Sequence, residues 1–244
     1  MSNEQPGQQL DDATREHSRR LRRRVLVGTS IIAAIAAVVA LTSGSAGAAP
    51  MIWRTTGSVP GCNTPMAGQP NGKQWPVEPA MSIDTTATYT ATLETSCGRM
   101  TLALDAAKAP RTVNSFAFLA NESYFDHTKC HRLTTEGIYV LQCGDPTGTG
   151  RGGPGYQFSD ENLAGATYPA GTVAMANSGP NTNGSQFFLV YQDSRLPANY
   201  TPFGKISSGT EVLSNIAGGG VTDGSGDGAP VADVVLDLVS ASRG

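Results

Sequence analysis

The side chains best suited to chemistry lie in two stretches, residues 130–156 and residues 175–188. The first contains Arg132 and Gln142, and the second is a long polar loop that runs into an aromatic strand. An arginine stays charged and donates hydrogen bonds through a rigid fork, so it can stabilise an electron-rich atom without losing a proton. Taken alone, however, the second stretch could equally be an ordinary hairpin loop.

The other reactive residue types form no recognisable hydrolytic or metal site. His127 and His131 are far from any nucleophile in a known signature, which gives a hydrolase no support. The four cysteines are separated by 35, 33 and 13 residues, spacings that match no zinc template. We therefore expect no metal ion and no cofactor.

Both stretches resemble the cyclophilin family of peptidyl-prolyl cis-trans isomerases. Residues 175–188 read MANSGPNTNGSQFF, and the family segment M-A-N-x-G-P-N-T-N-G-S-Q-F-F leaves one position in fourteen free. Residues 131–133 and 141–156 are similar to the family segments F-H-R and Q-G-G-D-x-T-x-G-x-G-G-x-x-Y, in the same order. The likeness covers residues 87–239, nearly two thirds of the chain.

The resemblance implies that the chain isomerises X-Pro peptide bonds and that Arg132 is the catalytic arginine. Rotation about such a bond has a barrier of about 18 to 20 kcal/mol, because the nitrogen lone pair is delocalised into the carbonyl. Lowering this barrier requires a donor that stabilises the pyramidal nitrogen of the twisted amide, and a dry pocket for the proline ring. Gln142 lies two positions beyond Val140 on the same face of a predicted strand and would orient the guanidinium.

By the same resemblance, eight further residues bind the substrate: four in the proline pocket, three along the substrate backbone and one at the pocket rim. In that order they are Tyr139, Val140, Phe188 and Leu196; Ala176, Asn177 and Gln186; and Tyr200. A purely structural role in the core or in a loop is the alternative for the first seven. For Arg132 the alternative is a structural salt bridge, and for Gln142 it is the role of an ordinary surface glutamine.

The chain departs from the family close to this site. The connection between Arg132 and Gln142 is two residues longer than usual, which shifts the alignment there by up to one residue. The family usually has Phe at the place of Tyr139 and Met at that of Val140, and it often has His at the place of Tyr200. Arg195 stands where Trp is common, which argues against tight binding of the cyclic immunosuppressant that gives the family its name.

The resemblance also suggests how the cysteines pair. Cys130 and Cys143 flank the two predicted catalytic residues on strands that should be antiparallel neighbours, so their Cβ atoms could lie within the roughly 3.5 to 4.5 Å that a disulfide requires. We expect this bond, and a second one from Cys62 to Cys97.

The N-terminal end predicts delivery across a membrane. Residues 1–24 form a basic tail with six arginines, and residues 25–43 are a transmembrane anchor or signal segment whose first 17 residues carry no charge. An uncleaved anchor would make this a single-pass protein of the cell membrane, with residues 1–24 in the cytoplasm and the catalytic domain outside it. The alternative is secretion after cleavage near Ala48, where the sequence has a small-x-small form.

Residues 44–86 are rich in Pro and Gly and are predicted to be a linker, either a plain spacer or a segment that docks a partner. Residues 87–240 must then supply the elements that position the site. Periodicity predicts a hairpin over residues 89–104, a helix over residues 110–121 and a short helix around residues 212–216. Further strands are expected at residues 130–133, 138–142, 171–176, 187–191, 201–206 and 234–239.

Many short strands with few helices predict a mainly β fold: a closed antiparallel eight-stranded cyclophilin-like barrel capped by two short helices. The net charge of -3 offers nothing that would attract nucleic acid. We expect a monomeric isomerase that acts on proline-containing polypeptides, assists the folding of exported proteins and touches the membrane through residues 25–43. The alternative is a module with weak catalysis that binds proline segments as a docking or chaperone unit.

Overall fold

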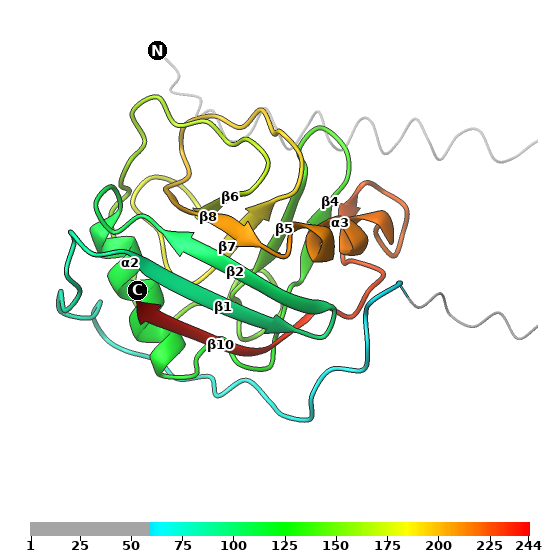
Figure 1. The fold of residues 1–244 in the computed structure, drawn as a ribbon, viewed down its shortest axis with the longest axis horizontal. Helices are drawn as coiled ribbons and strands as arrows, with labels where there is room; N and C mark the ends of the chain where they lie inside the picture. The colour runs from blue at the N-terminus through cyan, green and yellow to red at the C-terminus, as the bar shows by residue number, and fades with distance from the viewer. Residues whose placement is uncertain (1–58) are drawn as a thin grey trace, which may run out of the picture. The chain divides into compact units, whose positions relative to one another are not determined.

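The computed structural model describes residues 59–244, which form one curled antiparallel sheet of ten strands with two helices (Figure 1). The elements in chain order are β1 (Tyr89–Thr95), β2 (Gly98–Leu104), α2 (Pro110–Asn121), β3 (Thr128–Lys129), β4 (Arg132–Thr134), β5 (Val140–Cys143), β6 (Thr172–Met175), β7 (Phe187–Val190), β8 (Pro202–Ser208), α3 (Thr210–Gly218), β9 (Asp227–Gly228) and β10 (Val235–Arg243). The strand order across the sheet is β3-β10-β1-β2-β8-β6-β7-β5-β4-β9. The prediction of a mainly β, antiparallel fold with two helices is confirmed.

The sheet differs from the predicted closed eight-stranded barrel at its two ends. Eight strands have three to nine residues, and the two outermost strands, β3 and β9, have two residues each. Within residues 59–244 the hydrogen-bonded ladder therefore ends at β3 and β9, and the short chain from β3 to β4 joins the two ends of the sheet. Two-residue strands show no alternation of apolar residues, so no sequence pattern predicts them.

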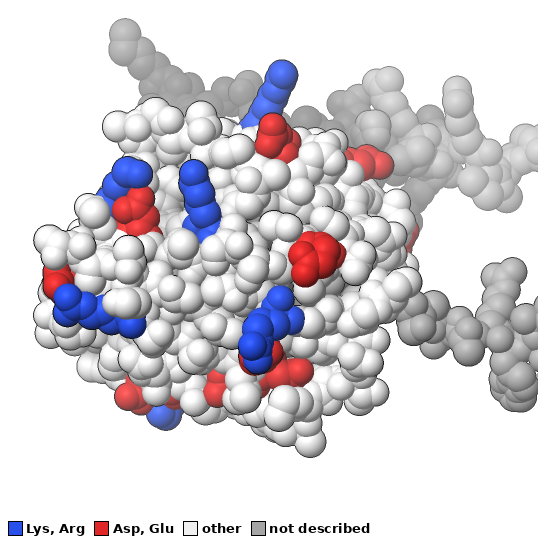
Figure 2. Space-filling view, in the orientation of Figure 1, with Lys and Arg blue, Asp and Glu red and all other residues white. Residues whose placement is uncertain are grey.

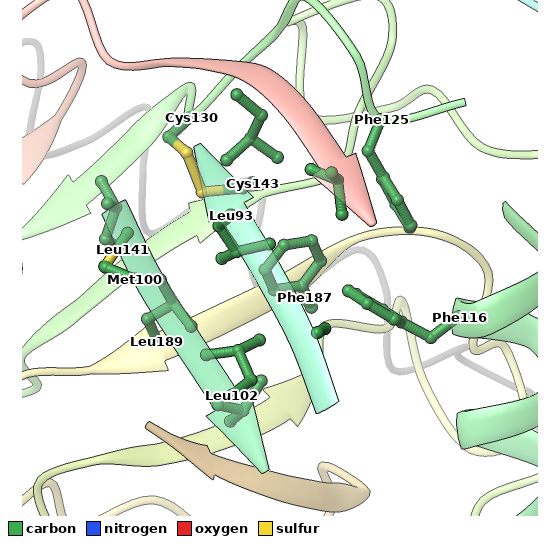
Figure 3. Close-up of a cluster of buried hydrophobic side chains, with 14 of the residues drawn as sticks. Leu93, Met100, Leu102, Phe116, Phe125, Cys130, Leu141, Cys143, Phe187 and Leu189 are labelled. Atoms are coloured by element: carbon green, nitrogen blue, oxygen red, sulfur yellow. A yellow bond between two sulfur atoms is a disulfide. The ribbon is translucent and has the colours of Figure 1, made fainter. Parts of the chain in front are cut away.

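The central strands are buried on both faces. In β7, Phe187 and Leu189 belong to the main core, whereas Phe188 and Val190 belong to a second, smaller cluster. Since successive side chains of a strand point to opposite faces, the two clusters lie on opposite sides of the sheet. Figure 3 shows the main core, with Phe187 beside Phe116 of α2 and leucines of several strands around them.

Helix α2 has the predicted limits, and a distant carboxylate completes its first turn. Glu161 accepts hydrogen bonds from the backbone N–H and the hydroxyl of Thr112, at 2.9 and 2.8 Å. A negative charge is favourable there, because the N–H groups of the first turn have no partner within the helix. On the buried side of the helix, Phe116 stacks on Phe125 with ring centroids 4.9 Å apart.

Both predicted disulfides are present, Cys62–Cys97 and Cys130–Cys143. They close loops with sequence separations of 35 and 13 residues. In the chain-entropy model such loops stabilise the fold by about 4 and about 3 kcal/mol, respectively.

Residues 59–86, the described part of the predicted linker, lie against the domain instead of extending away from it. We call this segment the strap. It contains no helix or strand and follows β10 toward α2 (Figure 1). Trp75 fixes its middle, because its backbone N–H donates to the Pro154 carbonyl at 2.8 Å and its ring packs edge-on against Phe118 at 5.1 Å.

Residues 59–244 contain no helix that is long and apolar enough to cross a membrane. The predicted basic tail (1–24), the anchor or signal segment (25–43) and the first part of the linker lie outside the described residues. The alternative cleavage point near Ala48 lies outside them too.

Charged side chains are scattered over the face of the domain that Figure 2 shows, and basic and acidic groups alternate there with uncharged surface. Several charged groups of the domain are paired, including Arg111 with Glu78 and Arg243 with Asp84. Water screens exposed pairs of this kind, so the fold depends on its core and its disulfides instead.

We expect Trp75→Ala to lower the free energy of unfolding by about 2 kcal/mol or more, because it removes a large ring from a partly buried aromatic contact. Urea unfolding followed by circular dichroism measures the change. Val77→Ala is the matched control, since Val77 lies on the same strap with 69% of its surface exposed. Equal, small effects of the two substitutions would show that the strap adds nothing to stability.

Candidate functional site

The antiparallel register of β4, β5 and β7 brings predicted site residues together on the face opposite the main core. Arg132 pairs with Gln142, and Gln142 pairs with Phe188. Directly paired residues point to the same face of a sheet, so these three side chains form a row. Their neighbours Leu133 and Leu141 point the other way and are fully buried in the main core.

A chain of hydrogen bonds runs from this row into the adjacent loop. Arg132 Nη1 donates to Gln142 Oε1 at 3.3 Å, and Gln142 Nε2 donates to Gln186 Oε1 at 2.8 Å. Gln186 Nε2 in turn donates to the Gly152 carbonyl at 2.9 Å. The oxygen and the nitrogen of the Gln142 amide are both hydrogen-bonded, and so are those of the Gln186 amide. These bonds fix the orientation of the side chains in the row.

The guanidinium of Arg132 is also held by Asp227 of β9. Arg132 Nε donates to Asp227 Oδ1 and Arg132 Nη2 donates to Asp227 Oδ2, both at 2.7 Å. The hydrogen bond from Arg132 lowers the pKa of Asp227, and the same bond raises the pKa of Arg132, so the pair is charged at neutral pH. These contacts and the one to Gln142 occupy three of the five N–H donors of an arginine, which leaves two for a ligand.

Beside the guanidinium lies a cavity of about 160 Å³. Its lining residues are Arg132, Ile138, Val140, Gln142, Ala176, Asn177, Phe188, Leu196 and Tyr200. The structure thus brings together eight of the ten predicted site residues around one small hollow, with a charged donor on one side and apolar walls on the other. Gln186 stands just behind this lining, bonded to Gln142.

Tyr139 is the predicted pocket residue that lies elsewhere, and Ile138 stands in the cavity wall instead. The ring of Tyr139 packs edge-on against Tyr191 at 5.8 Å, and its backbone N–H donates to the Ser194 hydroxyl at 2.9 Å. The physical reason is the alternation of side chains along the chain, which places residues 138, 140 and 142 on one face and residue 139 on the other.

Three aromatic rings make the apolar wall rigid. Phe188 and Tyr200 meet edge-to-face at 5.6 Å, and Tyr168 lies behind them, 6.2 Å from Tyr200. The Tyr168 hydroxyl donates to the Tyr200 carbonyl at 2.8 Å and accepts the Tyr200 N–H at 3.1 Å. Burial raises the pKa of Tyr168, so its hydroxyl stays protonated at neutral pH.

A second, polar groove of about 520 Å³ adjoins the cavity and shares Gln142, Ala176 and Asn177 with it. Its other walls come mainly from residues 150–157 and from the chain around Gln186, with Gln74 of the strap at one side. An apolar hollow next to a polar groove can hold an apolar ring and the polar backbone attached to it at the same time.

Asp145 organises the loop that lines this groove. Its carboxylate accepts hydrogen bonds from the backbone N–H of Thr147 at 2.7 Å and of Gly150 at 2.6 Å. Burial raises the pKa of Asp145, but hydrogen bonds from Thr147, Gly152 and Gly150 outweigh it and leave this pKa below its usual value. A side chain at Gly152 would place its Cβ 2.0 Å from the Asp145 carboxylate, so only glycine fits there.

His131 lies next to Arg132, and both of its ring nitrogens are buried and have no hydrogen-bond partner among residues 59–244. Burial lowers its pKa; the nearby Asp145 opposes this shift and the charge of Arg132 adds to it. Within residues 59–244, no cluster of three His, Cys, Asp or Glu side chains is arranged to hold a metal ion.

Ile138, Tyr168 and Asp227 contribute to the site although they are not among the residues predicted from the sequence. Alternation backward from Gln142 could have identified Ile138, because the two lie four residues apart on one face. Tyr168 forms only an isolated bridge, and Asp227 lies 95 residues from Arg132 in a two-residue strand, so no local pattern points to either.

The domain is similar to proteins of one family. The family model for "Cyclophilin type peptidyl-prolyl cis-trans isomerase/CLD" matches residues 90–240. The "Probable peptidyl-prolyl cis-trans isomerase B" of Mycobacterium leprae is 50% identical over 165 residues, which are 62% of this chain and 56% of that protein. The protein of the same description from Mycobacterium tuberculosis is 47% identical over 167 residues, 63% of this chain and 54% of that protein. The chain spans about half the length of these curated relatives.

A solved structure has a similar fold. It is the crystal structure of a Cryptosporidium parvum cyclophilin type peptidyl-prolyl cis-trans isomerase in the presence of the dipeptide Ala-Pro. The comparison gives a TM-score of 0.56 with 29% sequence identity, and it covers 64% of this chain and 99% of that chain.

We expect the free energy of unfolding to fall as the pH decreases below 6.5, the ordinary pKa of histidine, because unfolded His131 takes up a proton that the folded domain resists. Stability from this group is fully present above that pH and is lost toward the lowered pKa of the folded state. Urea unfolding between about pH 5 and 8 measures the slope, and His131→Gln should reduce it. Identical slopes in the two proteins would contradict the assignment to His131.

Proposed function

Because the chain belongs to the cyclophilin-type peptidyl-prolyl cis-trans isomerase family, we propose that it isomerises X-Pro bonds in polypeptides, with Arg132 as the catalytic residue. The observation that carries this proposal is the position of the Arg132 guanidinium at the edge of a cavity of about 160 Å³ that also has apolar walls from Val140, Phe188 and Leu196. A charged, rigid donor beside a hollow suited to a small ring is the arrangement that this reaction needs.

The proposed reaction makes and breaks no covalent bond. The prolyl nitrogen becomes pyramidal as the amide twists, and its lone pair, no longer shared with the carbonyl, becomes a better hydrogen-bond acceptor. The two free N–H donors of Arg132 would stabilise this twisted state more than the planar one, which is the condition for lowering the barrier. Gln142, held by Gln186, would keep the guanidinium in place through its 3.3 Å contact.

The proposal also assigns the two hollows. The proline ring would enter the apolar cavity between Val140, Phe188 and Leu196, and the backbone on one side of the proline would lie in the polar groove beside Ala176 and Asn177. Holding one flank of the bond while the other rotates requires two such adjacent sites. The chemical identity of the hollows supports this assignment, since one has apolar walls and the other is lined by amides and backbone.

We further propose that the domain works outside the cytoplasm, on exported proteins, and that residues 25–43 deliver or anchor it. Two disulfides support an oxidising compartment, because such bonds are rare in the reducing cytosol. The basic run before an uncharged segment supports the orientation. Protease added to intact spheroplasts of cells that express the full chain should digest the domain, and digestion only after lysis would contradict this location.

We expect Arg132→Ala to lower kcat/KM for a proline tetrapeptide by about 100-fold, because it removes the donors of the twisted amide. A protease-coupled or NMR exchange assay with the purified protein measures the rate. Arg99→Ala is the matched control, since Arg99 is an exposed arginine that pairs with Glu94 on the neighbouring strand, and it should retain the wild-type rate.

Two results would overturn the proposal in different ways. An unchanged rate in Arg132→Ala would remove Arg132 from the mechanism. A wild-type domain that binds proline peptides without accelerating their isomerisation would make the chain a binding module.

A further inference from the structure

A turn that lies far along the sequence from the predicted site motifs contacts Arg132. Residues 221–230 form this turn, closed at its base by a bridge between Val221 and Pro230. Its far side contains β9, which pairs with β4 so that Gly228 lies opposite Leu133. The Gly226 carbonyl also accepts the Thr135 N–H at 2.7 Å. These contacts attach the turn directly to the strand that bears Arg132.

The turn places the Asp227 carboxylate so that both of its oxygens accept hydrogen bonds from Arg132. Asp227 accepts from Nε and Nη2 of Arg132, both at 2.7 Å, and these two N–H groups form one edge of the planar guanidinium. A bidentate contact fixes the rotation of the guanidinium plane as well as its position. Since Gln142 takes a donor on Nη1, the remaining donors, one on each terminal nitrogen, have defined directions.

The longer connection after β4 is part of the same assembly. Glu136 lies in that connection and packs over Gly226, where an added Cβ would lie 2.9 Å from the Glu136 side chain. The extra residues of the connection therefore lie against the turn that bears Asp227. The longer connection, where the chain departs from the family pattern, and the turn that contains Asp227 therefore pack together.

Two effects of Asp227 oppose each other. Its negative charge reduces the field of the guanidinium at the substrate, whereas its two hydrogen bonds hold the flexible arginine side chain in one orientation. The side chain of Asp227 is 54% exposed, so water screens its charge strongly, while the directional bonds persist. Positioning is therefore the larger effect.

We infer that Asp227 is a positioning residue, which holds Arg132 in the orientation needed to stabilise the twisted prolyl amide. This inference rests on the proposed isomerase function. It assigns the turn 221–230 a part in the reaction, although none of the turn lines the cavity.

The test compares kcat and KM of the full-length protein and its Asp227→Asn variant on a proline tetrapeptide. We expect kcat/KM to fall about tenfold, mostly through kcat, because a misplaced donor affects the twisted state more than peptide binding. Asp227→Glu should recover part of the loss, since it restores a carboxylate. Asp233→Asn is the charge-matched control, because Asp233 pairs with the exposed Lys129 instead.

A double substitution separates positioning from a general effect on folding. In a chain that already carries Arg132→Lys, Asp227→Asn should change kcat/KM by less than about twofold, because lysine has no fork for the carboxylate to hold. A full tenfold loss in the Arg132→Lys background would overturn the inference.

The Arg132 Nε–H signal in nitrogen-15 NMR reports the contact without any activity. It should exchange slowly with water in the wild type and rapidly in Asp227→Asn. A wild-type protein without isomerase activity would refute the proposed function, whatever this signal shows. An active wild type whose kcat/KM or Nε–H exchange is unchanged by Asp227→Asn would refute the inference alone.

Discussion

The pairing register of β4 with β5 is the constraint on which the rest of the site depends. It places Arg132 opposite Gln142 and leaves Leu133 opposite Leu141 in the main core. A slip of one residue would exchange these faces and bury a guanidinium among leucines and phenylalanines, which costs several kcal/mol. The packing of the main core therefore enforces the position of the charged group on the other side of the sheet, and fold and site cannot be varied independently there.

Covalent bonds reinforce this register where the hydrogen-bonded ladder is short. β4 has only three residues and shares two paired positions with β5. The Cys130–Cys143 disulfide joins the chain just before β4 to the end of β5, and both cysteines are buried in the main core. The second disulfide ties the start of the strap to the first hairpin, and the strap in turn supports the loop that lines the polar groove through Trp75 and Pro154. The bonds that stabilise the domain also hold both sides of the site.

The ion pair between Arg132 and Asp227 stabilises the fold only weakly, but it holds the arginine side chain in place. Arg132 and Asp227 have 39% and 54% of their side-chain surface exposed, so their ion pair contributes at most about 1 kcal/mol to folding. Its importance is geometric, because a long side chain that bonds to a carboxylate and an amide together has little freedom left. The aromatic wall of Tyr168, Phe188 and Tyr200 is ordered by the same principle, through two hydrogen bonds between Tyr168 and Tyr200.

The sequence alone determined the family, the hairpin, the helix α2 and most residues of the cavity, because these depend on local periodicity or on short motifs. The sequence predicted Tyr139 in the pocket, whereas Ile138 lines it in the structure. The longer connection after Arg132 shifted the alignment with the family by one residue, but the alternation of side chains along the strand was unaffected. Only the tertiary structure decided how residues 59–86 lie against the domain, that Tyr168 supports the wall, and that Asp227 grips Arg132 across 95 residues. These contacts join segments without regular structure or with strands of two residues, where no repeat exists to be read, and the folding of the whole sheet brings them together.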